Sequence, residues 1–333
     1  MKIIMTTGDC NGIGIEVMIK GIIDFDKKSG MSQDIDIYIA GNNETISEYI
    51  DNFNFPTSVS ENTLLINNRT CPIINCGDYS PVNLGSETIE AGKLAAAAIE
   101  KAVEKTKSAE FDALITMPVS KSVLYKVGWK YPGHTEMLAA SCNVEKPLMI
   151  LCTESIRVGL ATIHISLKDV PNSISKTGLI EITEKFNQSL KDDFGISNPN
   201  IALLGLNPHS GEDGSMGKEE IEIIIPAVKE LKKMNINAFG PFPADGFFAH
   251  DEYKQYDGIM AMYHDQGLIP LKLLAQGAGV NVTAVLPIVR TSPDHGTAFN
   301  IAGKNIADGK SVSQAIHIAV SIANNRNLLK FSL

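Results

Sequence analysis

The 333-residue chain has few cysteines, no cysteine framework and no long apolar run. Its five cysteines form no CxxC pair and show no regular spacing, which favours a reducing compartment over a disulfide scaffold. No apolar stretch approaches the roughly 18–20 residues of a membrane-spanning helix. The opening residues, MKIIMTTGDCNG, lack the apolar core and cleavage site of a signal peptide. We therefore expect a cytoplasmic protein.

The chain also lacks any block of like charges, although its net charge is −9. This balance argues against nucleic acid or an acidic membrane surface as the main partner. A small anionic ligand is still compatible, because local basic groups can oppose the overall sign. Apolar residues make up 44% of the chain, which is an ordinary globular composition. The length allows one large domain or two moderate ones.

The usual nucleotide and zinc motifs are absent or incomplete. Gly12-Ile-Gly14 is followed by Val17 where the dinucleotide fingerprint needs glycine. The stretch from Gly211 to Gly217-Lys218 has five intervening residues instead of four, and Glu219 replaces the serine or threonine of a P-loop. No HExxH occurs. A dinucleotide, if bound, is therefore not held by a standard Rossmann turn.

Apolar strand-like segments alternate with helical patterns along the chain. The expected strands are 2–5, 36–40, 113–116, 147–152, 158–163, 201–206, 258–262 and 282–286, the fourth and fifth forming a hairpin. The expected helices are 16–22, 86–107 with Ser86 as N-cap, 219–234 and 311–324. Pro226 must lie early in its helix or kink it. This alternation predicts α/β layers around a largely parallel sheet.

Polar residues gather where apolar strands end. The clearest case is His264-Asp265-Gln266, which follows the strand 258–262 and precedes a glycine expected to make a tight turn. His164 and His209 each follow a separate apolar strand. A single such histidine is more often an ordinary turn residue. Three imidazoles that converge at one sheet edge would instead suit a catalytic divalent-metal site.

A basic and amide set follows His264, made of Lys272, Asn281 and Arg290. Solvated surface is the simplest interpretation of the first two. Arg290 is expected to end an apolar strand, and a lysine with a fork-shaped arginine suits a phosphate or carboxylate. The loop 291–298 beyond it contains a His-Gly pair.

Taken in order, the motifs GDCNGIGIE, PVSK, YPGHTE, IHISLKDVP, GLNPHSGEDGSMGKEE, GPFPAD, AMYHDQG, GVN and RTSPDHGTAFNIAGK span nearly the whole chain. Together they resemble the 4-hydroxythreonine-4-phosphate dehydrogenase family of pyridoxal phosphate biosynthesis. The resemblance implies a fold similar to isocitrate and isopropylmalate dehydrogenases, with two α/β/α domains and a cleft between them. The expected domains are 1–130 with 290–333, and 131–289.

The resemblance also implies a role for each matched residue. The metal ligands correspond to His164, His209 and His264, and the metal to Zn, Mg or Co. The substrate contacts correspond to His134, Thr135, Lys272, Asn281 and Arg290. A loop similar to the adenine loop of isopropylmalate dehydrogenase supplies His295, Gly296, Thr297, Ala298 and Asn300. The first glycine loop departs from the family's usual GDPAGIGPE, because Cys10 and Ile15 stand where it has prolines.

The implied activity is NAD- or NADP-dependent oxidation of 4-phosphohydroxy-L-threonine, after which the 3-oxo acid loses CO₂. A homodimer with the site near the subunit interface is implied as well. Asp265, Asp245 or Lys121 could transfer the proton, and the sequence does not choose among them. A D-threonate or D-erythronate 4-phosphate dehydrogenase of the same family is the main alternative. A metal-dependent phospho-sugar isomerase or aldolase is the alternative from another class.

Overall fold

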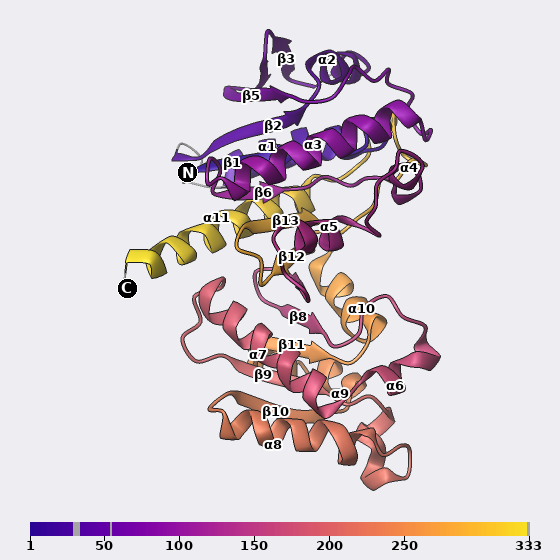
Figure 1. Ribbon diagram of the computed structural model, residues 1–333, viewed down its shortest axis with the longest axis vertical. Helices are drawn as coiled ribbons and strands as arrows, with labels where there is room; N and C mark the ends of the chain where they lie inside the picture. The colour runs from indigo at the N-terminus through magenta and orange to yellow at the C-terminus, as the bar shows by residue number, and fades with distance from the viewer. Residues whose placement is uncertain (29–33, 54, 332–333) are drawn as a thin grey trace. The chain divides into compact units, whose positions relative to one another are not determined.

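The computed structural model describes residues 1–28, 34–53 and 55–331, and the chain divides into two compact units (Figure 1). The first comprises Met1–Pro147 and Leu286–Ala323, and the second Leu148–Val285 and Asn324–Leu333. The boundaries between the units thus lie at residues 147/148, 285/286 and 323/324. The domain boundaries expected from the sequence were 130/131 and 289/290.

The first unit contains one sheet in the order β13-β6-β1-β2-β5-β4-β3. Its strands are β1 (Lys2–Thr6), β2 (Asp36–Gly41), β3 (Thr57–Ser60), β4 (Thr63–Ile66), β5 (Arg69–Asn75), β6 (Ala113–Ile115) and β13 (Val289–Pro293). The strands from β13 to β5 run parallel, and β4 and β3 add an antiparallel edge. The carboxyl ends of β1, β6 and β13 therefore meet at one edge.

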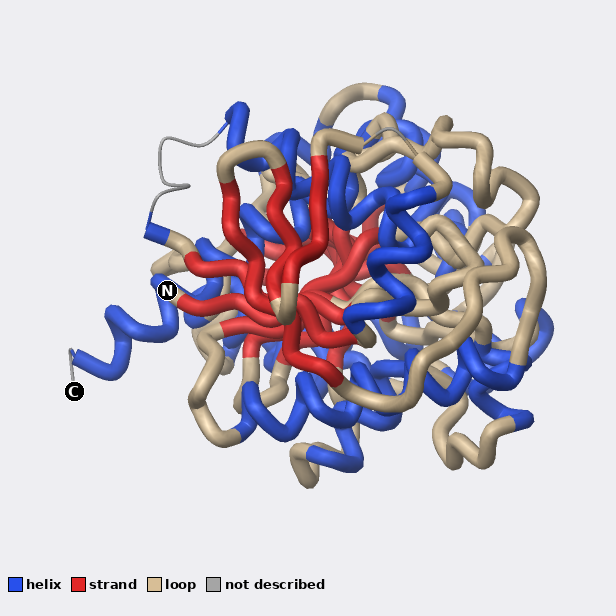
Figure 2. The backbone as a smooth tube through the Cα atoms, turned by 90° about the horizontal axis from the view of Figure 1, so that it is seen from above, coloured by secondary structure: helices blue, strands red, loops and turns tan. Residues whose placement is uncertain are grey.

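The helices of this unit are α1 (Gly14–Lys28), α2 (Asn43–Asp51), α3 (Ile89–Lys107), α4 (Lys121–Lys126), α5 (His134–Ser141) and α11 (Lys310–Phe331), whose last residues belong to the second unit. Of these, α1 connects the parallel strands β1 and β2, and α3 connects β5 and β6. Figure 2 draws the helices in blue and the strands in red. The predicted N-cap Ser86 is wrong, because Thr88 caps α3 by accepting the Ala91 N–H at 3.3 Å. The alanines of α3 bury one face on the sheet, so small side chains bring helix and sheet close.

The second unit contains strands in the order β10-β9-β11-β8-β7-β12. They are β7 (Leu148–Cys152), β8 (Arg157–Leu160), β9 (Asn200–Leu204), β10 (Asn237–Phe242), β11 (Gly258–Ala261) and β12 (Val280–Ala284). The predicted hairpin is confirmed as the antiparallel pair β7–β8, and β12 also pairs antiparallel with β7. The strands β8, β11, β9 and β10 run parallel to one another. The predicted α/β class is confirmed in both units.

The helical segments of the second unit are η2 (Leu167–Asp169), α6 (Val170–Ser173), α7 (Lys176–Asp192), η3 (Pro208–Gly214), η4 (Glu220–Ile224), α8 (Ile225–Lys233), α9 (Ala244–Ala249), η5 (Glu252–Gln255) and α10 (His264–Ala275). Pro226 lies in the first turn of α8, after the wider π-turn η4. This agrees with the expectation that Pro226 must lie early or kink its helix, since proline has no N–H to donate to the preceding turn.

Each unit has its own apolar core. Ile4, Leu114 and Ile99 belong to the first core, and Ile259 and Leu268 to the second. No helix within the described residues has both the length and the apolar character to cross a membrane.

Candidate active site

The three predicted metal-binding histidines follow three neighbouring parallel strands. His164 comes after β8, His209 after β9 and His264 after β11, and β11 pairs with both β8 and β9. Carboxyl ends of adjacent parallel strands lie along one edge, where α/β proteins bind ligands. The topology therefore carries all three histidines to the same edge of the second unit's sheet.

Two of these histidines lie next to each other. The ring centres of His164 and His264 are 5.8 Å apart and the rings are tilted by 42°. Two imidazoles bound to one zinc ion through ordinary bonds of roughly 2.0–2.1 Å have ring centres about 5 Å apart. The pair thus fits a shared divalent ion with a small adjustment of the side chains.

Asp265 orients one ring of this pair. Its Oδ1 lies 2.7 Å from His264 Nδ1, and a carboxylate on one ring nitrogen leaves the other nitrogen to bind a metal. His264 is the first residue of α10 and Gly267 lies within this helix, so the tight turn predicted at Gly267 is wrong: the chain enters a helix directly.

Gln266 ties the ends of β11 and β9 together. Its Oε1 accepts the Met262 N–H at 2.7 Å, and its Nε2 donates to the Gly205 carbonyl at 2.6 Å. Met262 follows β11 and Gly205 follows β9. The segments that lead to His264 and His209 are therefore linked by one half-buried amide side chain.

His209 begins a run of left-handed backbone. Residues 209–213 all have positive φ, from 42° to 81°, and only Gly211 among them is glycine. Such backbone is costly for other residues and persists only where its surroundings enforce it, most often at functional sites. Among the described residues, no three His, Cys, Asp or Glu side chains are close enough to hold a metal. The structure thus brings His164 and His264 together but does not complete the triad with His209.

Glu220 holds the backbone that leads into this strained segment. It is almost fully buried and accepts the backbone N–H of Leu206 and of Asn207, both at 2.7 Å. It also accepts from Asn207 Nδ2 at 2.9 Å. The carboxylate of Glu220 therefore anchors the loop that leads to His209. The sequence did not reveal this role, because Glu220 is one of several charged residues at the start of a helix.

The other predicted residues of the second unit lie on three elements. Lys272 lies two turns beyond His264 on α10, so both project from the same face of that helix. Asn281 lies on β12, and its buried Oδ1 has no hydrogen-bond partner among the described residues. Asp245 lies in the first turn of α9 after β10. Buried amide oxygens usually accept a hydrogen bond, so a bound ligand would explain why Asn281 Oδ1 has no partner in the protein.

Arg290 is buried in the first unit, 3% exposed. Its Nε and Nη2 donate to Thr116 Oγ1 at 3.1 and 2.6 Å. Arg290 is the second residue of β13, so the prediction that it ends an apolar strand is wrong. Burial lowers the pKa of this guanidinium to about 10, and the nearby Glu136 opposes that shift. A desolvated guanidinium of this kind binds an anion strongly.

His134 and Thr135 open α5 beside this cation. The pKa of His134 is lowered to about 3, mainly by burial and further by the positive charges of Arg290 and Lys121. Its Nε2 is buried without a hydrogen-bond partner among the described residues. A Cβ built on the preceding Gly133 would lie 3.7 Å from Lys121 Nζ. A neutral imidazole, two cations and the amides of a helix start therefore lie together, and these are groups that can bind an anion.

Asp9 is a further buried acid in the first unit, in the loop after β1. It is 1% exposed, its N–H donates to the Pro118 carbonyl at 3.0 Å, and its Oδ1 accepts the Asn11 N–H at 3.0 Å. Its Oδ2 has no partner within the part of the chain that the structure describes. Burial raises the pKa of Asp9 from 3.8 to about 6, and the nearby Glu87 adds to the shift.

The shifted pKa makes Asp9 a source of pH-dependent instability. Because the folded state holds this proton more tightly than the unfolded state, stability falls as pH rises from about 4 to about 6. We therefore expect Asp9→Asn to gain stability over the wild type, by up to roughly 3 kcal/mol, between pH 4 and pH 8. Urea unfolding at both pH values measures this. A gain of the same size in the exposed variant Asp51→Asn would contradict the assignment.

The candidate cofactor loop follows β13. Turns close it between Ala298 and Lys304, with hydrogen bonds from Ile301 N to Ala298 O at 3.0 Å and from Lys304 N to Ile301 O at 3.1 Å. Ala298 has a positive φ of 45°. Apart from its two chain neighbours, no described residue has a heavy atom within 4 Å of the position that a Cβ would take on Gly296. The loop therefore has open space at the glycine where close approach to a ligand was predicted.

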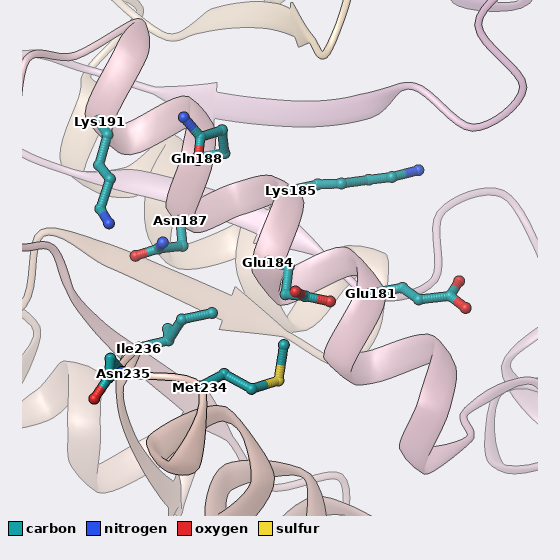
Figure 3. Close-up of a pocket in the computed structure, with 9 residues that line it drawn as sticks. All are labelled: Glu181, Glu184, Lys185, Asn187, Gln188, Lys191, Met234, Asn235 and Ile236. Atoms are coloured by element: carbon teal, nitrogen blue, oxygen red, sulfur yellow. The ribbon is translucent and has the colours of Figure 1, made fainter.

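A groove of about 590 Å³ lies elsewhere in the second unit (Figure 3). It is formed by α7 and by the turn between α8 and β10. Lysines and glutamates line it together with Met234 and Ile236. It contains none of the predicted site residues, and its mixed charges favour no particular ligand.

Comparison with known proteins assigns the chain to a family. The family model of the pyridoxal phosphate biosynthetic protein PdxA matches residues 33–319. The 4-hydroxythreonine-4-phosphate dehydrogenase of Bacteroides thetaiotaomicron is 40% identical over 330 residues, which is 98% of this chain and 90% of that protein. The enzyme of the same name from Prosthecochloris aestuarii is 40% identical over 329 residues, 96% of this chain and 97% of that protein.

Solved structures agree. The crystal structure of 4-hydroxythreonine-4-phosphate dehydrogenase from Klebsiella pneumoniae has a TM-score of 0.78 to this chain at 33% identity, covering 97% of this chain and 99% of that one. The resemblance found in the sequence motifs is confirmed. The chain belongs to the PdxA family of pyridoxal phosphate biosynthetic proteins.

Proposed function

We propose that this protein oxidises 4-phosphohydroxy-L-threonine with NAD or NADP to 2-amino-3-oxo-4-phosphooxybutanoate, which decarboxylates to 3-amino-2-oxopropyl phosphate. The relatives from Bacteroides thetaiotaomicron and Prosthecochloris aestuarii are 4-hydroxythreonine-4-phosphate dehydrogenases, which supports this substrate. The observation in the chain itself that carries the proposal is the buried cation Arg290, held beside a neutral His134. That cluster suits the phosphate of such a substrate, and membership of the PdxA family supports a role in pyridoxine 5′-phosphate biosynthesis.

The phosphate end of the substrate is assigned to the first unit's cluster. Arg290 supplies a desolvated fork of N–H donors, and the first amides of α5 at Thr135 supply more. His134 stays neutral at physiological pH because its pKa is so low, so it accepts or donates a hydrogen bond without adding charge. Lys272 and Asn281 are proposed as the remaining substrate contacts, the latter through its unpartnered Oδ1.

A divalent metal is proposed at the second unit's histidines. His164 and His264 fit one ion by their ring separation, and His209 is the proposed third ligand. When bound, a divalent ion lowers the pKa of a hydroxyl and polarises the ketone that forms from it. The sequence allows Zn, Mg or Co. Asp265 serves as the orienting partner of His264, which leaves Asp245 and Lys121 as candidates for proton transfer.

The loop from His295 to Lys304 is proposed to hold the adenosine half of the dinucleotide, through His295, Gly296, Thr297, Ala298 and Asn300. A valine at Gly296 would enter open space and strain no neighbour. We expect Gly296→Val to raise the KM for NAD by roughly tenfold or more, about 1.4 kcal/mol, by occupying that space. The KM for the phosphorylated substrate should change little. Steady-state kinetics with each substrate varied decide this, and a loss confined to the phosphorylated substrate would move the loop to the other end of the site.

A homodimer with its active site near the subunit interface and a cytoplasmic location complete the proposal. α10 exposes Ile269 and Leu273, 59% and 74%, on the helix that begins with His264, and such a surface favours association. All five cysteines are free thiols, as suits a reducing compartment. Sedimentation velocity tests the dimer, and a concentration-independent monomer would exclude it.

Nicotinamide reduction coupled to CO₂ release tests the activity. The purified protein, supplied with 4-phosphohydroxy-L-threonine, NAD and a divalent metal, should produce NADH and CO₂ in equal amounts. A phospho-sugar isomerase or aldolase would convert its own substrate without any change in nicotinamide absorbance. Such a result, together with no NADH from 4-phosphohydroxy-L-threonine, would remove the dehydrogenase proposal.

A further inference from the structure

The turn just before α1 contacts the near end of the candidate cofactor loop. The Ile13 N–H donates to the Thr297 carbonyl at 3.0 Å. A Cβ on Gly12 would lie 2.7 Å from that same oxygen, so only glycine allows the two backbones to approach so closely. The near end of the loop is therefore held by the two residues just before α1.

The next turns of α1 hold the far end of the loop. Lys20 Nζ donates to the carbonyl of Asn305 at 3.0 Å and to that of Ala307 at 2.9 Å. It also pairs with Glu16 Oε1 at 2.7 Å, and the same oxygen accepts the Ala307 N–H at 2.9 Å. One ion pair thus binds three backbone groups of the segment 305–307.

This ion pair is mostly buried. The Glu16 side chain is fully buried, and that of Lys20 is 25% exposed. Glu16 Oε2 has no hydrogen-bond partner among the described residues. An apolar pair of similar volume at these positions would usually be no less stable. The ion pair instead fixes the position of the loop, because each of its hydrogen bonds to the loop is made with a particular backbone atom.

We infer that Glu16 and Lys20 are positioning residues for the dinucleotide. Their ion pair holds residues 305–307 on α1 while Ile13 holds Thr297, so the intervening loop keeps one shape. Without the far contact the loop samples several shapes, and the dinucleotide binds only the fraction that is competent. This inference rests on the proposed adenosine-binding role of the loop.

Three variants of the full-length protein test the inference. The double variant Glu16→Gln/Lys20→Met removes both charges together, which avoids leaving Glu16 buried and unpaired. Lys20→Arg keeps the charge and N–H donors that can reach the same carbonyls. Lys27→Met is the matched control, because Lys27 lies on α1 and makes only a 4.0 Å surface contact with Asp24 among the ion pairs of the described residues. NADH affinity is measured by fluorescence titration, KM for each substrate by steady-state kinetics, and folding by thermal melting.

The double variant should bind NADH roughly tenfold more weakly, the change expected if about a tenth of the loops remain competent. Its KM for the phosphorylated substrate should stay near the wild-type value. Lys20→Arg should recover most of the affinity, and Lys27→Met should match the wild type. A folded double variant that binds NADH as the wild type does would overturn the inference. If that variant does not fold, undiminished affinity in Glu16→Gln/Lys20→Gln, which also removes both charges, would do the same.

Failure of the proposed adenosine-binding role of the loop would give different results. If the wild type does not bind NADH, or if Gly296→Val leaves NADH affinity unchanged, the loop is not an adenosine site and the inference falls with it. If Gly296→Val weakens binding and the double variant does not, only the positioning role of Glu16 and Lys20 is excluded.

Discussion

Replacing His264 by alanine should abolish turnover while the protein stays folded. His264 shares its ring contact with His164 and is oriented by Asp265. Removal of an outer-shell partner typically costs roughly 10- to 100-fold in metal affinity or activity, and loss of a direct ligand should cost more. Metal content after dialysis and kcat at saturating substrate measure the effect. His164→Ala and His209→Ala should behave in the same way.

Two comparisons make this result specific. His250→Ala removes an exposed histidine at the end of α9 and should leave activity and metal content unchanged. Asp265→Asn should have an activity and a metal content between those of His264→Ala and His250→Ala. Its metal binding should be weaker, and added Zn, Mg or Co should restore it. If Asp265→Asn loses kcat with full metal content, Asp265 is the proton-transfer group and not an orienting one. A His209→Ala protein that keeps normal activity after chelation and dialysis would show that the metal site is misassigned.

Replacing Arg290 by methionine should damage use of the phosphorylated substrate. Methionine keeps much of the buried volume but removes the charged fork that Thr116 orients. A charge-assisted contact contributes roughly 1.5–3 kcal/mol, so kcat/KM should fall about 10- to 150-fold. NADH affinity, measured by fluorescence, should not change.

Arg69→Met is the matched control for Arg290. Arg69 is also a partly buried guanidinium of the first unit, bound to Asp26 at 2.6–3.0 Å. Its loss should lower stability without changing the KM for the phosphorylated substrate. An unchanged kcat/KM in Arg290→Met, with both variants folded, would remove Arg290 from the substrate site.

The common sheet edge of the three histidines could be predicted from the sequence because local patterns determine it. Each of His164, His209 and His264 follows a short apolar run, and parallel strands bring such positions to one edge. What the pattern could not give is the backbone at each histidine. Left-handed residues at 209–213 and a helix that begins at His264 depend on distant supports such as Glu220 and Gln266.

Long-range contacts account for what the sequence did not reveal in the first unit. The raised pKa of Asp9 arises from burial among loops far apart in the sequence. Lys20 binds carbonyls nearly a full chain length away. Arg290 was expected at a strand end because the apolar run before it reads as a strand, yet β13 begins only at Val289. Neither burial nor a strand start is encoded in local periodicity.

The most direct test of the proposed function is a comparison of substrates on the metal-loaded wild type. 4-Phosphohydroxy-L-threonine, D-threonate 4-phosphate and D-erythronate 4-phosphate are assayed in parallel with NAD and with NADP. We predict the highest kcat/KM for 4-phosphohydroxy-L-threonine, with 3-amino-2-oxopropyl phosphate as the product. A higher value for either hydroxy acid phosphate would contradict the proposal and make this chain a hydroxy acid phosphate dehydrogenase of the same family.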